Sequence, residues 1–148
     1  MTISFRVAEQ ADVAPVVALL ADDMLGQTRE RGDMSTYQAA FEAMRAEGGN
    51  HLVVGVIATE VVACYQITFI SGLSLSAARR AQIEGVRVAS SHRGQRIGEA
   101  LMRDAEARAR EAGCALLQFT TNRSRADAHR FYDRLGFTPS HIGYKKSL

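Results

Sequence analysis

Cysteines, prolines and long apolar runs are scarce in this sequence, and each scarcity excludes a class of protein. The two cysteines, Cys64 and Cys114, lie 50 residues apart, so neither a metal knuckle nor a CxxC redox motif is present. Only 2 prolines and 12 glycines occur, which excludes collagen-like and low-complexity chains. No apolar run reaches about 18 residues, and no basic start precedes an apolar stretch. We therefore expect a cytoplasmic protein with no membrane partner.

Length and charge narrow the remaining classes. The 148 residues, 47% of them hydrophobic and 23% charged, suit a single domain spanning 1–148. The formal net charge of +2 is too small to indicate a nucleic-acid partner. Of the 18 basic residues, 16 are arginines. This excess reflects either genomic base composition or guanidinium groups that bind an anion such as phosphate.

Hydrophobic periodicity predicts six strands and four helices. We expect strands at 3–7, 51–57, 61–70, 82–88, 115–121 and 141–146, and helices at 12–20, 35–47, 96–112 and 124–135. Asp12 is placed to cap the first helix, and capping boxes are predicted at Ser35 with Gln38 and at Ser124 with Asp127. In the strand at 82–88, simple alternation places Glu84 on one face with Val86 and Val88. Residues 21–34 have no clear period.

The connection between the strand at 82–88 and the helix at 96–112 has the features of a phosphate-binding turn. A glycine-bearing loop that enters a helix directs unpaired backbone N–H groups outward, and the helix dipole adds partial positive charge. Arg93 and Arg96 flank this loop and can add charge-assisted hydrogen bonds. Neither GxxxxGK[ST] nor GxGxxG is present, so a nucleoside triphosphate or dinucleotide site is disfavoured.

Two segments resemble the GNAT family of acetyl-CoA-dependent N-acetyltransferases. The run from Arg93 to Gly98, RGQRIG, resembles motif A of that family, R/Q-x-x-G-x-G/A, with Arg96 in place of the first signature glycine. If that position needs a positive φ, an arginine there costs about 1 kcal/mol or more. The run from Asn122 to Phe137, NRSRADAHRFYDRLGF, is similar to motif B, with its Asn, its Phe-Tyr pair and its Gly-Phe.

The resemblance implies an α/β (α+β) GNAT fold. Its central sheet would be mixed, mostly antiparallel and twisted, with six to seven strands and about four flanking helices. The resemblance also implies direct acetyl transfer from acetyl-CoA, as cosubstrate, to an amine acceptor, with no metal. The implied cosubstrate-binding residues are Val86, Arg87, Val88, Arg93, Gly94, Gln95, Arg96, Ile97, Gly98, Glu99, Asn122 and Tyr132.

The expected chemistry assigns roles to a few of these residues. Because an ammonium group with a pKa near about 10.4 must lose a proton before it attacks, the site needs a base or a water path, and Glu84 is the candidate. A backbone N–H near Val88 would polarise the thioester carbonyl. Tyr132 occupies the position where the family usually places the general acid that protonates the CoA thiolate.

Each of these assignments has a structural alternative. Glu84 can instead pair with Arg79, Arg80 or Arg87, and Tyr132 can instead be a core aromatic beside Phe131. Arg93 and Arg96 can be solvated charges, and Asn122 can start a helix. Asp22, Asp23 and Glu30 line an acceptor cleft or form a solvated turn. The histidines His51, His92, His129 and His141 lack metal-ligand spacing.

Two other functions stay open at this point. The chain can be a CoA-binding sensor of the same fold without turnover, or a general phosphate-ligand α/β protein. The family often forms homodimers, but the sequence does not decide the oligomeric state. The identity of the amine is not readable from the sequence, because its signature segments do not include the acceptor side.

Overall fold

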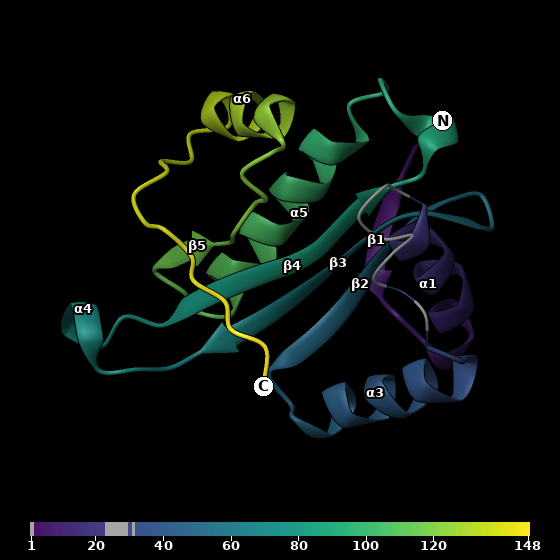
Figure 1. Ribbon diagram of the computed structural model, residues 1–148, viewed down its shortest axis with the longest axis horizontal. Helices are drawn as coiled ribbons and strands as arrows, with labels where there is room; N and C mark the ends of the chain where they lie inside the picture. The colour runs from purple at the N-terminus through teal and green to yellow at the C-terminus, as the bar shows by residue number, and fades with distance from the viewer. Residues whose placement is uncertain (1, 23–29, 31) are drawn as a thin grey trace. The chain divides into compact units, whose positions relative to one another are not determined.

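The computed structural model describes residues 2–22, 30 and 32–148, in two compact units that span Met1–Gln118 and Phe119–Leu148. The first unit contains a sheet with the strand order β1-β2-β3-β4-β5 (Figure 1). The strands are β1 (Ser4–Val7), β2 (Asn50–Ile57), β3 (Glu60–Ile70), β4 (Arg80–Val88) and β5 (Leu116–Gln118). Neighbouring strands are antiparallel except β4 and β5, which are parallel. The mixed sheet was predicted, although the described residues form five strands rather than six to seven.

The two faces of the sheet pack against different helices. On one face, α1 (Val13–Ala21) contacts β3 and β4, and α3 (Met34–Ala46) contacts β2. On the other face, α5 (Ile97–Glu111) contacts β3, β4 and β5 and runs along β4 in Figure 1. The buried residues of α5 are Ile97, Leu101, Met102, Ala105 and Ala109, which include the inner stripe that the periodicity predicts. None of the described helices is long and apolar enough to cross a bilayer.

The starts of the first two helices differ from the predicted caps. Asp33, not Ser35, caps α3, because its Oδ1 accepts a hydrogen bond from the Thr36 N–H at 3.1 Å. The predicted box at Ser35 is therefore wrong by two residues. Part of the unpatterned connection at 21–34, including Asp23, lies outside the described residues.

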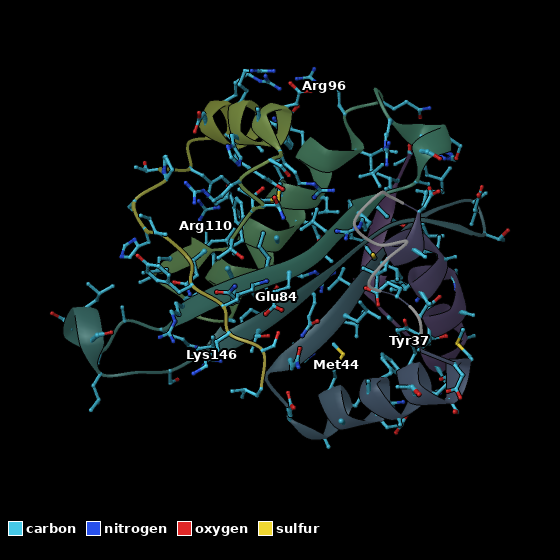
Figure 2. The ribbon with its side chains drawn as sticks, in the orientation of Figure 1. Tyr37, Met44, Glu84, Arg96, Arg110 and Lys146 are labelled. Atoms are coloured by element: carbon cyan, nitrogen blue, oxygen red, sulfur yellow. The ribbon has the colours of Figure 1, made fainter. Side chains whose placement is uncertain are left out.

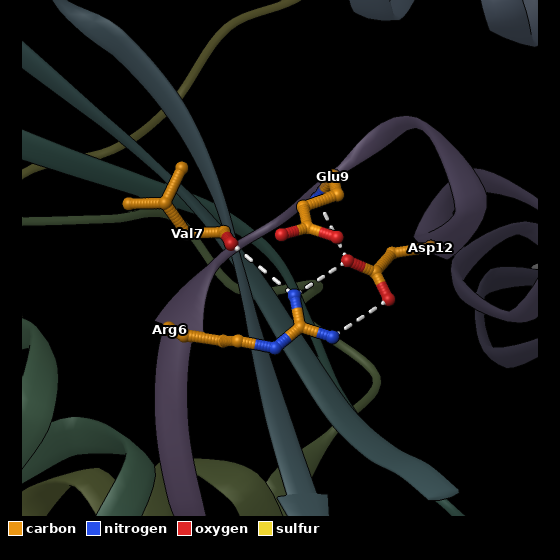
Figure 3. Close-up of polar contacts among 4 residues, drawn as sticks. All are labelled: Arg6, Val7, Glu9 and Asp12. Carbon is orange, nitrogen blue, oxygen red and sulfur yellow. Dashed lines mark hydrogen bonds and ion pairs between the residues drawn. The ribbon is translucent and has the colours of Figure 1, made fainter. Parts of the chain in front are cut away.

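A bidentate ion pair between Arg6 and Asp12 spans the turn between β1 and α1 (Figure 3). Arg6 donates from Nη1 and Nη2 to Oδ2 and Oδ1 of Asp12 at 2.7 and 3.0 Å, and the Glu9 N–H donates to Oδ2 at 2.7 Å. The side chain of Asp12 thus binds residues that precede it and makes no cap bond to α1. The bonds from Arg6, above all, hold the pKa of the Asp12 carboxyl below its ordinary value.

A β-bulge interrupts the alternation of β4. Gln66 of β3 faces Glu84, and Cys64 faces Arg87, so the single residue Tyr65 lies opposite the pair formed by residues 85 and 86. Gly85 provides the extra residue and has a left-handed φ of +59°. Because one inserted residue exchanges the two faces of a strand, Glu84 shares its face with Arg87 and not with Val86 and Val88. The predicted shared face is wrong for this reason.

The second unit contains α6 (Ala126–Arg134) and a cluster of aromatic rings. Ser124 does not cap this helix; its N–H and Oγ donate to Asn122 Oδ1 at 3.0 and 2.7 Å, which forms a turn before the helix. The strand predicted at 141–146 is absent from the structure of these residues. No second strand exists within 119–148 to pair with it, and a lone strand leaves its backbone groups without a ladder.

Candidate functional site

The connection from β4 to α5 exposes the amino-terminal turn of a long helix. After η2 (Ser90–His92), Gly94 has a φ of +80° and Arg96 a φ of +61°, so two residues within three adopt the left-handed conformation. Arg96 is the N-cap of α5, and no side chain caps the helix there. The N–H groups of the first turn are therefore available to a ligand, with the helix dipole behind them. An anion such as a pyrophosphate fits this turn.

The charges around this turn are arranged as a row along α5. Arg96 Nε donates to Glu99 Oε2 at 3.0 Å, and Arg103 Nη2 donates to Glu99 Oε1 at 2.6 Å. The carboxylate of Glu99, which lies in the first turn of the helix, is thus neutralised by two guanidinium groups. Figure 2 shows Arg96 at this end of α5, and its side chain is 82% exposed. The three side chains together retain one positive charge near the turn.

The edge of β4 next to this loop is open within the first unit. Among the described residues of that unit, β5 pairs with β4 only from Arg80 to Gln82. Residues 83–88 therefore have no paired strand on that side within 1–118, and the bulge at Gly85 twists this part of β4 further. Val86, Arg87 and Val88 are half-buried there. An open strand edge can bind an extended ligand through backbone hydrogen bonds.

Glu84 is solvent-exposed on β4, beside the bulge. Among the described residues, its carboxylate makes no hydrogen bond and no ion pair, so the pairing with Arg79, Arg80 or Arg87 that the sequence allowed is not present. Arg79 instead donates to the Ala112 carbonyl at 3.1 Å and to Ser71 Oγ at 2.8 Å. Glu84 is thus available to accept a proton.

Tyr132 and Asn122 lie in the second unit. The ring of Tyr132 lies 4.4 Å from that of Phe119 and 5.3 Å from that of Phe131, centroid to centroid, so the expected packing beside Phe131 is present. Asn122 uses its side-chain oxygen for the turn at Ser124, and its carbonyl lies 3.0 Å from His129 Nε2. These contacts hold Asn122 in the turn that precedes α6, whose N-cap is Arg125.

A polar network buried between the sheet and α5 was missed at the sequence level. The Tyr65 hydroxyl donates to Asp104 Oδ2 at 2.5 Å, and Arg108 Nε donates to the same oxygen at 2.8 Å. Arg108 Nη2 also donates to the Phe5 carbonyl at 3.3 Å. Burial, followed by the bond to Asp104, raises the pKa of Tyr65. The side chain of Arg108 is only 27% exposed.

Polar side chains on the sheet were also missed. Gln66, Thr68 and Gln118 share a face with Gln82 and Glu84 of β4. The signal was present as alternate polar residues in otherwise apolar strands, but it does not show which face of the sheet they occupy. No group of three His, Cys, Asp or Glu side chains that could hold a metal occurs in the described part of the chain.

Comparisons with known proteins agree with this geometry. The profile of the family described as "Acetyltransferase (GNAT) family" matches residues 17–137. A solved structure described as a transcriptional regulator from Bacillus halodurans C-125 is 41% identical and superposes with a TM-score of 0.95 over 99% of this chain and 100% of that one. A putative acetyltransferase from Agrobacterium tumefaciens str. C58 is 26% identical, with a TM-score of 0.87 over 98% and 99% of the two chains.

A further relative is named as an N-acetyltransferase. Over 67 residues, the chain is 45% identical to the aminoalkylphosphonate N-acetyltransferase of Salmonella typhimurium (strain LT2). The aligned part covers 45% of this chain and 44% of that enzyme, so it spans less than half of the relative. The chain belongs to the GNAT acetyltransferase family. Enzymes of this family use acetyl-CoA as their acetyl donor.

Proposed function

We propose that the protein transfers the acetyl group of acetyl-CoA directly to the primary amine of a small molecule or peptide. The observation that carries this proposal is the uncapped turn of α5, opened by left-handed residues at 94 and 96, beside the open and bulged edge of β4. A pyrophosphate and an extended pantetheine arm need these two features side by side.

We assign binding of the donor to two segments. Residues 93–99 would hold the pyrophosphate, chiefly through backbone N–H groups, because the guanidinium of Arg96 already binds Glu99. Val86, Arg87 and Val88 would hold the pantetheine arm along the edge of β4, and a backbone N–H near Val88 would polarise the thioester carbonyl. The resemblance of Asn122–Phe137 to motif B is what supports a role for Asn122 and Tyr132 in donor binding.

The proposed reaction needs two protons to leave the nitrogen and one to reach the sulfur. Glu84 takes the first proton from the acceptor ammonium, and the freed amine nitrogen attacks the thioester carbonyl carbon, which forms the C–N bond of a tetrahedral intermediate. As this intermediate collapses, the C–S bond breaks and Tyr132 gives its proton to the departing thiolate. The second proton of the nitrogen then returns to the tyrosinate, which leaves a neutral amide and CoA thiol. The lone carboxylate of Glu84 supports its role, since no partner within the described residues competes for it.

The relatives support two refinements of this proposal. The match to an aminoalkylphosphonate N-acetyltransferase supports a small amine as acceptor and puts aminoalkylphosphonates first among the amines to test. The whole-chain similarity to a protein described as a transcriptional regulator supports the second candidate, a CoA-binding sensor without turnover. A single domain over 1–148, a cytoplasmic location and a homodimer remain predictions.

Thiol release from acetyl-CoA, measured across a panel of primary amines, tests the proposal. We expect turnover with at least one small amine, together with acetylated product in mass spectra. Tight acetyl-CoA binding without turnover on any amine would replace the enzyme by the sensor. Gly98→Glu should abolish acetyl-CoA binding in calorimetry, because it puts bulk and negative charge into the first turn of α5. Wild-type affinity in that variant would show that the loop is misassigned.

A further inference from the structure

The face of the sheet that packs against α1 and α3 changes from apolar to polar along its strands. Val54 of β2 and Cys64 of β3 face each other there and are 0% and 1% exposed. Farther along β3, Gln66 and then Thr68 occupy the same face. On the opposite face, Tyr65 and Ile67 are both 0% exposed, and the Tyr65 hydroxyl bonds to Asp104 of α5. On the face toward α1 and α3, the polar side chains of β3 therefore lie together at Gln66 and Thr68.

These polar side chains form a continuous row across four neighbouring strands. In register, Asn50 of β2 faces Thr68 of β3, Thr68 faces Gln82 of β4, and Gln82 faces Gln118 of β5. One step along the strands, Gln66 faces Glu84. We call this set the polar row; its members are Asn50, Gln66, Thr68, Gln82, Glu84 and Gln118.

Hydrogen bonds between members of the polar row hold its amides in place. Gln66 Nε2 donates to Asn50 Oδ1 at 2.9 Å, and Gln118 Nε2 donates to Gln82 Oε1 at 2.8 Å. A primary amide has two N–H donors and an oxygen with two lone pairs, so each bonded pair keeps donors and acceptors to spare, whichever way the amides are turned. Glu84 has no partner within the described residues. The side chains of the polar row are thus held in place and still have hydrogen-bonding groups available for a ligand.

The polar row meets a cavity at its β2 end. Asn50 lines a cavity of about 320 Å³ whose walls also include Phe41, Met44 and Leu52. Figure 2 shows Met44 pointing from α3 toward the sheet, and Glu84 over the middle of the sheet. Neighbouring strands are about 4.8 Å apart and successive residues of a strand about 3.3 Å, so Asn50, which is two strands and two residues from Glu84, lies about 12 Å from it. A small molecule that reaches from Glu84 can therefore contact Gln66 and extend toward this cavity.

We propose that the polar row is the floor of the acceptor subsite and that it selects amines bearing hydrogen-bonding oxygens, such as hydroxyl or phosphonate oxygens, over alkylamines. This inference rests on the proposed acetyl transfer. Glu84 binds the ammonium end, and the free amide groups of Gln66 and Gln82 bind the oxygens. An alkylamine would cover these amides without replacing their hydrogen bonds to water, and such burial is unfavourable.

The test compares amines of matched length in the full-length protein with saturating acetyl-CoA. An aminoalkylphosphonate and an amino alcohol supply the two kinds of oxygen, and an alkylamine supplies none. We expect the wild-type kcat/KM for at least one oxygen-bearing amine to exceed that for the alkylamine about tenfold or more. Gln66→Met and Gln82→Met should each raise the KM of that amine about tenfold, with the KM of acetyl-CoA and the alkylamine rate changed less than about twofold.

Gln38→Met is the matched control, since it removes a different amide pair, Gln10 with Gln38, outside the polar row. It should leave every constant unchanged, and thermal unfolding should confirm that all three variants fold. A wild-type preference for the alkylamine, or equal losses for both kinds of amine in the variants, would overturn the inference.

Calorimetry of the amines with CoA bound separates this inference from the proposed function. If no amine turns over, the proposed acetyl transfer fails, yet amine affinity still tests the row. About tenfold weaker binding in Gln82→Met than in Gln38→Met supports the polar row, and equal affinity refutes it. Whichever of the aminoalkylphosphonate and the amino alcohol binds more tightly identifies the kind of oxygen that the polar row binds.

Discussion

Replacing Arg96 by glycine and by alanine tests the left-handed conformation at the start of α5. Arg96 has a φ of +61°, and its guanidinium binds Glu99. Both variants lose that ion pair equally, so the difference between them reports on the backbone. The left-handed conformation costs a residue with a Cβ about 1–2 kcal/mol. Glycine avoids this strain but loses about 0.4–1 kcal/mol through its more flexible unfolded state.

We therefore expect Arg96→Gly to be more stable than Arg96→Ala by about 0.5–1 kcal/mol. In a domain of this length, that difference raises Tm by about 1–4 °C. Urea unfolding followed by circular dichroism measures it directly. If the site uses only the backbone N–H at this position, acetyl-CoA affinity should change less than about threefold in both variants, as calorimetry can show.

Ala100 provides the matched control in the same helix, where its N–H donates to the Arg96 carbonyl at 3.2 Å. At this ordinary helical position, Ala100→Gly should lose about 1 kcal/mol. Glycine is thus expected to give the more stable protein at position 96, and alanine the more stable protein at position 100. If alanine is more stable than glycine at both positions, Arg96 is not left-handed and the reasoning fails.

Three further predictions concern residues outside this loop. The Arg6 bonds lower the folded-state pKa of Asp12, so their contribution to the free energy of unfolding should be complete above the ordinary pKa of about 3.9 and decline as the pH falls through the folded-state pKa. Asp12→Asn should be about 1–2 kcal/mol less stable at pH 7, and its stability should depend less on pH in urea titrations. Tyr132→Phe should lower turnover about 10²-fold, with little change in acetyl-CoA affinity. Burial raises the pKa of Cys64 to about 12, so alkylation at pH 8, followed by mass spectrometry, should label Cys64 only after unfolding.

Each of these expectations has a result that contradicts it. Equal pH profiles for wild type and Asp12→Asn would show that this carboxyl keeps its ordinary pKa on folding. An unaltered rate in Tyr132→Phe would reject the acid role. Labelling of Cys64 in the folded protein at the rate of the partly exposed Cys114 would contradict its burial.

Local periodicity predicted most elements, and long-range pairing explains the failures. The helix expected at 96–112 is Ile97–Glu111, because its apolar stripe repeats over four turns. The bulge at Gly85 was not predictable, since it depends on the register against Tyr65, which is remote in sequence. Arg108 pairs with Asp104 at the same i,i+4 spacing as Arg110 with Glu106, so only the fold separates the half-buried pair from the surface pair.

In the candidate site, too, local features were predictable and long-range contacts were not. The turn at 93–98 was predictable because its signature is local, and the position of Glu84 on the strand at 82–88 was predictable from local alternation. The absence of an ion pair at Glu84 was not predictable, because Arg79 instead donates to the carbonyl of Ala112, the C-cap of α5, and this contact joins residues that are 33 positions apart. The polar row depends on four strands in register, so single-strand patterns could not assemble it.

The order of strands in the sheet has a consequence for how the chain is made. Strands that are neighbours in the sheet are also neighbours in the chain, so each new strand can pair with an edge that has already left the ribosome. β2 pairs with β1 only after α1 and α3 have been made, and β5 pairs with β4 only after α5, because a parallel neighbour requires this crossover. The open part of the β4 edge is therefore among the last regions of the first unit to be completed during synthesis, and a nascent chain that stops before α5 would expose the whole of that edge.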